Sequence, residues 1–218
     1  MATRALIFDF DGTLADTEAA VLRSWQEMFA EHGAKLPLDV WHTVIGTQNT
    51  ATTMFKLLAE QAENVDPESL RPAMRARVHE LLAEDGPREG VLAYLEEAAH
   101  HGLALGIASS SSSTWVHGQL ARLGLAHHFT AVETGDRHNP KPDPDTYLAA
   151  LRTLGVPAEE ALAFEDSPHG VSAAKAAGIP TIAIPNPITA PLDFAKADLV
   201  LPSFTTTTLT KLLQHFSQ

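Results

Sequence analysis

The chain has 218 residues and contains no cysteine, which excludes disulfide bonds and thiolate metal sites. Its formal net charge is −12, with only 15 lysine and arginine residues, so its surface repels a phosphodiester backbone and argues against a nucleic acid partner. The sequence shows neither an apolar run of membrane length nor a signal-peptide core, so we expect a cytoplasmic protein without a membrane partner. The length suits one large domain, or a core with a small inserted domain, and it indicates no oligomeric state.

Two carboxylates follow the first apolar run of the chain directly. Residues 5–8 predict a short buried strand, and Gly12 marks a turn after it. Asp9 and Asp11 therefore leave the end of a strand together, where one could attack as a nucleophile and the other could move a proton. Taken alone, the motif fits an Asp-Gly turn with solvated acids equally well.

Residues 16–86 predict a helical insert. Apolar residues recur at helical spacing over 22–32, 49–63 and 67–82, and the block shows no strand pattern. The acids and threonine at 16–18 are typical of a helix N-terminus.

From residue 90 onward, strands and helices alternate, which predicts a parallel sheet with helices on both faces. Strands are expected at 103–108, 129–133, 161–164, 180–184 and 199–201, and helices at 91–100, 114–123, 144–154, 171–177 and 209–216. The first strand belongs with this block. The predicted fold is therefore an α/β, Rossmann-like, doubly wound parallel sheet with an inserted all-helical domain, divided into a core (1–15 and 87–218) and an insert (16–86).

Two further signals lie at predicted strand ends. Ser109 closes the strand at 103–108, and its hydroxyl with the following N–H groups could hold an anion, although a cluster of capping serines is the more common interpretation. Lys141 stands between two prolines that fix the backbone and hold the root of the side chain still. By itself, such a lysine is more often a solvated loop residue.

Glu165 and Asp166 follow the strand at 161–164. An aspartate here is commonly a helix cap, but with Asp9 and Asp11 the pair could form a site for a hard cation such as Mg²⁺. Ligands of parallel sheets bind at the carboxyl edge, where all of these segments are expected to meet. A nucleophile, a proton donor, an anion pocket, a cation and a metal site are together what phosphoryl transfer requires.

These motifs closely resemble those of the haloacid dehalogenase superfamily. The match covers essentially the whole chain, with residues 9–14 as the first motif, Ser109 as the second, Lys141 as the third and residues 165–166 as the fourth. The helical insert resembles the family's cap of the first class, and the chain is most similar to the phosphatase and beta-phosphoglucomutase branch.

The resemblance implies a role for each residue of the motifs. Asp9 would be the nucleophile that forms an aspartyl phosphate, Asp11 the general acid and base, and Lys141 the cation that stabilises the transferred charge. The expected ligands of the Mg²⁺ cofactor are Asp9, the carbonyl of Asp11, Asp166, and Glu165 either directly or through water. The phosphoryl group would be bound by the Ser109 hydroxyl and by the backbone N–H groups of Phe10, Asp11 and Ser110.

Within the family, the residues favour net hydrolysis of a small phosphorylated metabolite, such as a sugar phosphate. Asp11 argues against dehalogenation, which needs no proton for a leaving alcohol. Beta-phosphoglucomutases carry a histidine where this chain has Val21 and an arginine in the cap loop where it has Gln48 and Asn49. Together with Thr47, these two polar residues are candidates for substrate binding. A phosphomutase and a non-catalytic binding protein remain as alternatives.

Overall fold

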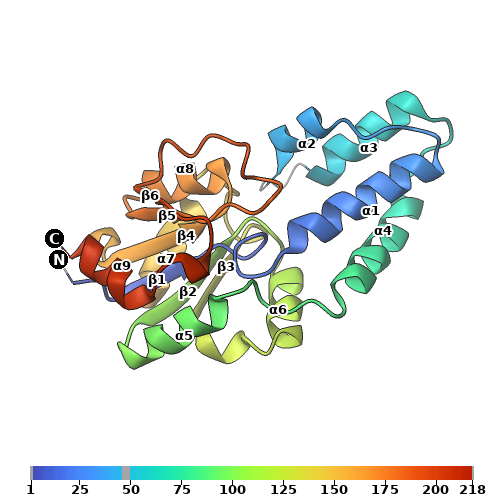
Figure 1. The fold of residues 1–218 in the computed structure, drawn as a ribbon. Coiled ribbons are helices and arrows are strands. Elements are labelled where there is room, and N and C mark those ends of the chain that lie inside the picture. The colour runs from blue at the N-terminus through green and yellow to red at the C-terminus, as the bar shows by residue number, and fades with distance from the viewer. Residues whose placement is uncertain (1, 46–49, 218) are drawn as a thin grey trace.

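The computed structural model describes residues 2–45 and 50–217 (Figure 1). Within them, a six-stranded sheet has the order β3-β2-β1-β4-β5-β6, and every neighbouring pair is parallel. The strands are β1 (Ala5–Phe8), β2 (Ala104–Ser109), β3 (Ala131–Thr134), β4 (Ala161–Glu165), β5 (Thr181–Ala183) and β6 (Leu199–Val200). β1 lies in the middle of the sheet, between β2 and β4.

The remaining elements are helical. The insert holds α1 (Thr17–Glu31), α2 (Leu38–Val44), α3 (Thr50–Gln61) and α4 (Pro67–Leu82). The helices around the sheet are α5 (Val91–His100), α6 (Ser113–Arg122), α7 (Asp145–Leu154), α8 (Pro168–Ala176) and α9 (Leu209–Phe216), with short 3₁₀ turns at Ala126–His128, Ala158–Glu160 and Phe204–Thr206. Among the described residues, no helix has the length and apolar character needed to cross a membrane.

Helices cover both faces of the sheet. Successive residues of β1 point to opposite faces, so they pack against different helices. Leu6 and Phe8 pack in one hydrophobic cluster with residues of α5, α6 and α9. Ala5 and Ile7 pack in a second cluster with residues of α7 and α8. Phe8 also stacks on Phe164 of the neighbouring strand β4, with ring centroids 4.7 Å apart. The predicted doubly wound α/β core is therefore confirmed.

Helices α1–α4 lie beyond the carboxyl edge of the sheet and have a hydrophobic cluster of their own (Figure 1). Trp25 of α1 meets Phe55 of α3 edge to face, with ring centroids 4.8 Å apart, and Trp41 of α2 is fully buried in the same cluster. Arg77 of α4 donates to Glu27 of α1 over 2.7 Å. These contacts confirm an all-helical insert, while the division of the chain at residues 16 and 86 stays a prediction.

Apart from shifts of one or two residues at strand ends, three local features differ from what the sequence led us to expect. Helix α2 escaped the sequence analysis because seven residues are too few for a clear periodicity. Helix α8 begins at Pro168, three residues early, because the Ser167 hydroxyl accepts the N–H of Gly170 and proline suits the first helical turn. Asp16 occupies the N-cap position of α1, but among the described residues its side chain makes no capping hydrogen bond.

Candidate active site

The parallel sheet brings the predicted motifs to one edge. Phe8 pairs in register with Ile107 of β2 and with Phe164 of β4, so these three strands end side by side. Asp9 therefore lies next to Ser109 and Glu165, and its backbone N–H donates to the Phe164 carbonyl over 2.9 Å. Segments separated by about a hundred residues or more of sequence thus meet at this edge.

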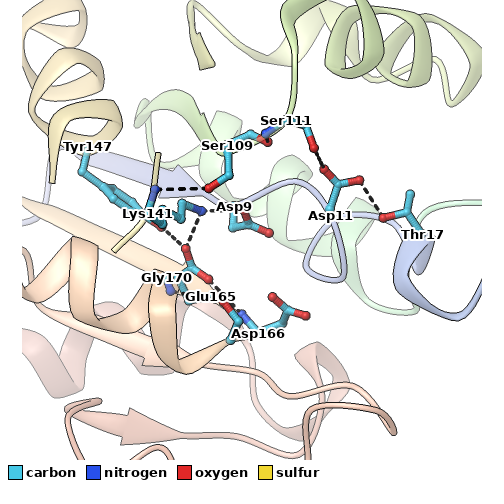
Figure 2. A network of polar contacts seen from close by, with 12 residues as sticks. Asp9, Asp11, Thr17, Ser109, Ser111, Lys141, Tyr147, Glu165, Asp166 and Gly170 are labelled. Carbon is cyan, nitrogen blue, oxygen red and sulfur yellow. Dashed lines mark hydrogen bonds and ion pairs between the residues drawn. The ribbon is translucent and has the colours of Figure 1, made fainter. Parts of the chain in front are cut away.

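Lys141 is buried between two carboxylates (Figure 2). Its Nζ atom donates to Oδ1 of Asp9 over 2.5 Å and to Oε1 of Glu165 over 2.6 Å, and only 3% of the residue is exposed. Burial alone would lower the pKa of the Lys141 ammonium, but the two carboxylates raise it above its ordinary value. Lys141 is therefore a fixed positive charge beside Asp9. The surrounding loop is held in turn by a hydrogen bond from the Lys141 N–H to the Ser110 hydroxyl, over 3.3 Å.

Tyr147 of α7 completes this network, and the sequence analysis did not find it. Its buried hydroxyl donates to Oε1 of Glu165 over 2.6 Å, and Lys141 Nζ lies 5.2 Å from the centroid of its ring. Burial, and then the charge of Glu165, raise the pKa of the Tyr147 phenol well above its ordinary value, so it stays a hydrogen-bond donor. Its only sequence signal is its place on the helix that follows the Lys141 loop.

Asp9, Glu165 and Asp166 form a buried acidic cluster, with one oxygen of each lying within 4.8 Å of the others. Oδ2 of Asp9 is buried, and within the described part of the chain it accepts no hydrogen bond. Oδ2 of Asp166 accepts from the amide of Asn186 over 2.7 Å. Burial, and then repulsion from Asp9 and Glu165, raise the pKa of Asp166 well above its ordinary value. Three carboxylates are thus gathered around a single lysine.

Two glycines make room for these acids. Gly12 adopts a left-handed backbone with φ of +83°, and a Cβ there would overlap the Asp166 carboxylate. A Cβ at Gly170 would likewise overlap the carboxylate of Glu165. The Gly12 carbonyl is held by a hydrogen bond from the guanidinium of Arg88 over 2.5 Å. Glycine at positions 12 and 170 therefore allows the backbone to approach the Asp166 and Glu165 carboxylates closely.

The donor set fits Mg²⁺. The three residues of the cluster offer carboxylate oxygens, which this hard cation prefers, and the buried Oδ2 of Asp9 lacks a protein partner among the described residues. Uncompensated carboxylates are costly to bury, so a divalent cation would relieve their mutual repulsion. Oδ2 of Asp9 accepts no hydrogen bond within the described residues, whereas Oε1 of Glu165 already accepts from Lys141 and Tyr147.

The carboxylate of Asp11 points away from this cluster (Figure 2). Oδ1 accepts from the Thr17 hydroxyl over 2.7 Å and from the Trp115 indole N–H over 2.8 Å, and Oδ2 accepts from the Ser111 hydroxyl over 2.5 Å. The sequence placed Asp9 and Asp11 together at one strand end, but it could not show that their side chains diverge. Thr17, Ser111 and Trp115 were not among the predicted site residues.

The two carboxylates open into one cavity of about 820 Å³ between the sheet edge and the helical insert. The core contributes Asp9, Asp11, Ser109, Ser110, Lys141 and Asp166 to its lining, and the insert contributes Thr17, Glu18, Thr50, Arg75 and His79. A site of this volume accommodates a small metabolite. Phe10, which stands between Asp9 and Asp11 in the sequence, is buried, and so is Ser109 at the end of β2. The candidate cap residues Thr47, Gln48 and Asn49 lie outside the described residues.

The sequence profile of haloacid dehalogenase-like hydrolases matches residues 6–184. The chain belongs to this family. It is 42% identical over 216 residues to YhcW of Bacillus subtilis, for which a phosphatase activity is inferred, with 98% of each chain covered. It is 30% identical over 179 residues to the fructose-1-phosphate phosphatase YqaB of Escherichia coli, covering 81% of this chain and 94% of that protein. The predicted membership of the superfamily is confirmed, and the chain is a hydrolase of its phosphatase and phosphomutase branch.

Solved structures of the family have the same fold. The crystal structure of CbbY from Rhodobacter sphaeroides in complex with phosphate matches with a TM-score of 0.81 at 32% identity, covering 97% of this chain and 99% of that chain. A variant of that protein, in complex with xylulose-1,5-bisphosphate, matches equally well. The arrangement of a parallel sheet and a helical cap is therefore shared with a family member that binds a sugar bisphosphate.

Proposed function

We propose that the chain is a Mg²⁺-dependent phosphatase that hydrolyses a small phosphorylated metabolite, most simply a sugar phosphate, through an aspartyl phosphate on Asp9. The observation that carries the proposal is the state of Asp9. One carboxylate oxygen is bound by the buried Lys141, and the other is buried without a protein partner among the described residues. A sugar phosphate as the substrate class is supported by the name of YqaB, a fructose-1-phosphate phosphatase, and by the xylulose-1,5-bisphosphate bound to the CbbY variant.

In the first half-reaction, an oxygen of Asp9 attacks phosphorus while the ester P–O bond breaks. Asp11 gives its proton to the leaving alcohol oxygen, so the alcohol departs neutral. The ammonium of Lys141, fixed by Asp9 and Glu165, lies beside the attacking carboxylate and stabilises the charge that develops around it. The Ser109 hydroxyl and the N–H groups of the loop after β1 orient the phosphoryl oxygens.

In the second half-reaction, Asp11 acts as a base. It takes a proton from a water molecule whose oxygen attacks phosphorus, and the bond to Asp9 breaks to release phosphate. Both residues then return to their initial state. Asp9 and Asp166, with the Asp11 carbonyl and with Glu165 directly or through water, would hold Mg²⁺, which when bound neutralises phosphate charge so that one anion can approach another.

The activity is tested by measuring phosphate release from a panel of sugar phosphates and nucleotides in the presence of Mg²⁺. Release supports the phosphatase. Conversion of one hexose phosphate into another without release would instead support a phosphomutase. Silence across the whole panel, with folded protein, would contradict any catalytic role.

Replacing the nucleophile gives the first prediction. Asp9→Asn removes the attacking charge and reduces phosphate release by about 10³-fold or more, while the far-ultraviolet circular dichroism stays unchanged. Asp39→Asn, an exposed aspartate on α2, is the matched control and keeps full activity. Retention of activity by Asp9→Asn would refute the assignment of the nucleophile.

Removing the metal gives the second prediction. Excess chelator stops phosphate release, and added Mg²⁺ restores it, because the acidic cluster cannot otherwise accept a phosphate dianion. Mg²⁺ also raises the thermal unfolding midpoint of the chelated protein, since it binds the folded state alone. Full activity in excess chelator would contradict the role of the metal.

A further inference from the structure

We propose that Trp115 of α6 is a positioning residue for Asp11, whose carboxylate it holds in a single orientation through the indole N–H. The inference rests on the proposed function, because it concerns the group that moves the proton in both half-reactions. Trp115 lies 104 residues from Asp11 in the sequence and belongs to a different element. Nothing in the catalytic motifs points to it.

The geometry around Asp11 carries the proposal. Its Oδ1 atom accepts two hydrogen bonds, from Thr17 over 2.7 Å and from Trp115 over 2.8 Å, and Oδ2 accepts one from Ser111 over 2.5 Å. The three donors come from α1, from α6 and from the loop between β2 and α6. Hydrogen bonds from three separate segments leave the carboxylate little freedom to rotate.

Tryptophan differs from the other two partners in a way that matters for proton transfer. The hydroxyls of Thr17 and Ser111 can donate or accept, so each can turn when Asp11 gains or loses a proton, whereas the indole N–H can only donate. Oδ1 is therefore an acceptor throughout the cycle, and Oδ2 is the oxygen that carries the transferred proton. Trp115 thus selects which oxygen of Asp11 gives the proton to the leaving group.

The indole is itself held between the two parts of the fold. It packs against the cluster of Ala20, Val78 and Leu82 from the insert, and its ring centroid lies 5.5 Å from that of His79 on α4. Trp115 also borders the cavity that contains Asp9 and Asp11. The position of the indole N–H that binds Asp11 therefore depends on how α1 and α4 pack against α6.

The leaving group provides the test. An alkyl phosphate releases an alkoxide that needs the proton of Asp11 as the P–O bond breaks, whereas 2,4-dinitrophenyl phosphate releases a stable phenolate that needs none. Trp115→Phe keeps an aromatic ring but removes the N–H. We expect it to slow single-turnover cleavage of the alkyl phosphate by about 10- to 100-fold. The rate of the dinitrophenolate burst stays within about twofold of the unmodified protein, because that step needs no general acid.

The comparison includes a structural control and a closer isostere. His117→Ala alters an exposed residue on the same helix and leaves both rates unchanged. Benzothienylalanine at position 115 keeps the bicyclic shape of tryptophan and lacks only the donor, so it reproduces the effect even if Trp115→Phe does not fold. Circular dichroism and thermal unfolding confirm the fold of each variant before the rates are compared.

The outcomes separate this inference from the proposed function. Selective slowing of the alkyl phosphate by loss of the N–H supports the positioning role. Equal slowing of both substrates, or of neither, overturns it while leaving the phosphatase intact. If the unmodified protein cleaves neither substrate, the proposed function fails and the positioning role fails with it.

Discussion

At the scale of single residues, the site is a problem of buried charge. Asp9, Glu165 and Asp166 are each almost completely buried, and one lysine cannot neutralise three carboxylates. Burying an unpaired ion is expensive, so the fold adds donors where it can. Tyr147 and Lys141 share Oε1 of Glu165, which makes Glu165 an anchor for the lysine as well as a candidate metal ligand.

Removing the phenol donor tests that anchor. Tyr147→Phe leaves Glu165 with Lys141 alone at Oε1, so we expect the free energy of unfolding to fall by about 1–3 kcal/mol, because a buried acceptor loses one of its bonds. Phosphate release slows as well, since Lys141 is less firmly held beside Asp9. Urea unfolding and steady-state kinetics measure the two effects.

Tyr94→Phe is the matched control, because its hydroxyl donates over 2.9 Å to the Thr207 carbonyl, away from the acidic cluster. It loses some stability and keeps its activity. If Tyr147→Phe behaved in the same way, Tyr147 would stabilise the fold without positioning Lys141.

At the scale of elements, the insert is a packed unit with its own hydrophobic cluster. Trp25 is 1% exposed and lies between Phe29 and Phe55, with ring centroids 6.5 and 4.8 Å away. The sheet core is built from other residues, centred on the stacked rings of Phe8 and Phe164. The two clusters stabilise different parts of the molecule, so we expect a substitution in one cluster to destabilise mainly the elements that pack in it.

Trp25→Ala is the corresponding prediction. The cavity that it leaves destabilises helices α1–α4 by about 3–5 kcal/mol and accelerates their amide hydrogen exchange, while β1 and β4 stay protected. Exchange followed by mass spectrometry resolves the two regions. Phe164→Ala is the comparison and accelerates exchange across the sheet. Uniform acceleration by Trp25→Ala would show that insert and core unfold as one unit.

At the scale of the whole molecule, the charge balance opposes the proposed substrate. With a net charge of −12, the chain repels a phosphate ester at long range, and only local cations at the site offset this repulsion. Lys141 is already shared by two carboxylates, which leaves the approach of the substrate unfavourable at low salt. The field of the molecule and the chemistry of the site thus act in opposite directions.

The salt dependence of kcat/KM tests whether long-range repulsion slows the binding of the substrate. Raising the KCl concentration from about 20 to about 150 mM screens the long-range repulsion and raises kcat/KM for a sugar phosphate at fixed Mg²⁺. An uncharged osmolyte at the same osmolarity serves as the control and has no such effect. A fall in kcat/KM with salt would mean that the substrate meets a net positive field.

The sequence by itself determined the alternation of strands and helices along the chain and the parallel α/β core, and it placed Asp9, Ser109, Lys141 and Glu165 at or just after strand ends. This was possible because apolar runs and turn signals are local, and because parallel strands present their carboxyl ends on one side. The order of the strands within the sheet came from the structure. The sequence did not predict the short helix α2, because seven residues show little periodicity. It also did not predict that α8 begins at Pro168, because a capping residue can move a helix boundary by a few residues.

Only the tertiary structure decided which side chains meet. Asp11 and Trp115 are 104 residues apart, and Tyr147 and Glu165 belong to different elements, so no local pattern predicts either hydrogen bond. The divergence of the Asp9 and Asp11 carboxylates has the same origin, because each turns toward donors that the fold supplies from elsewhere. Hydrogen-bond partners depend on distances in space, which a one-dimensional pattern of residue types does not contain.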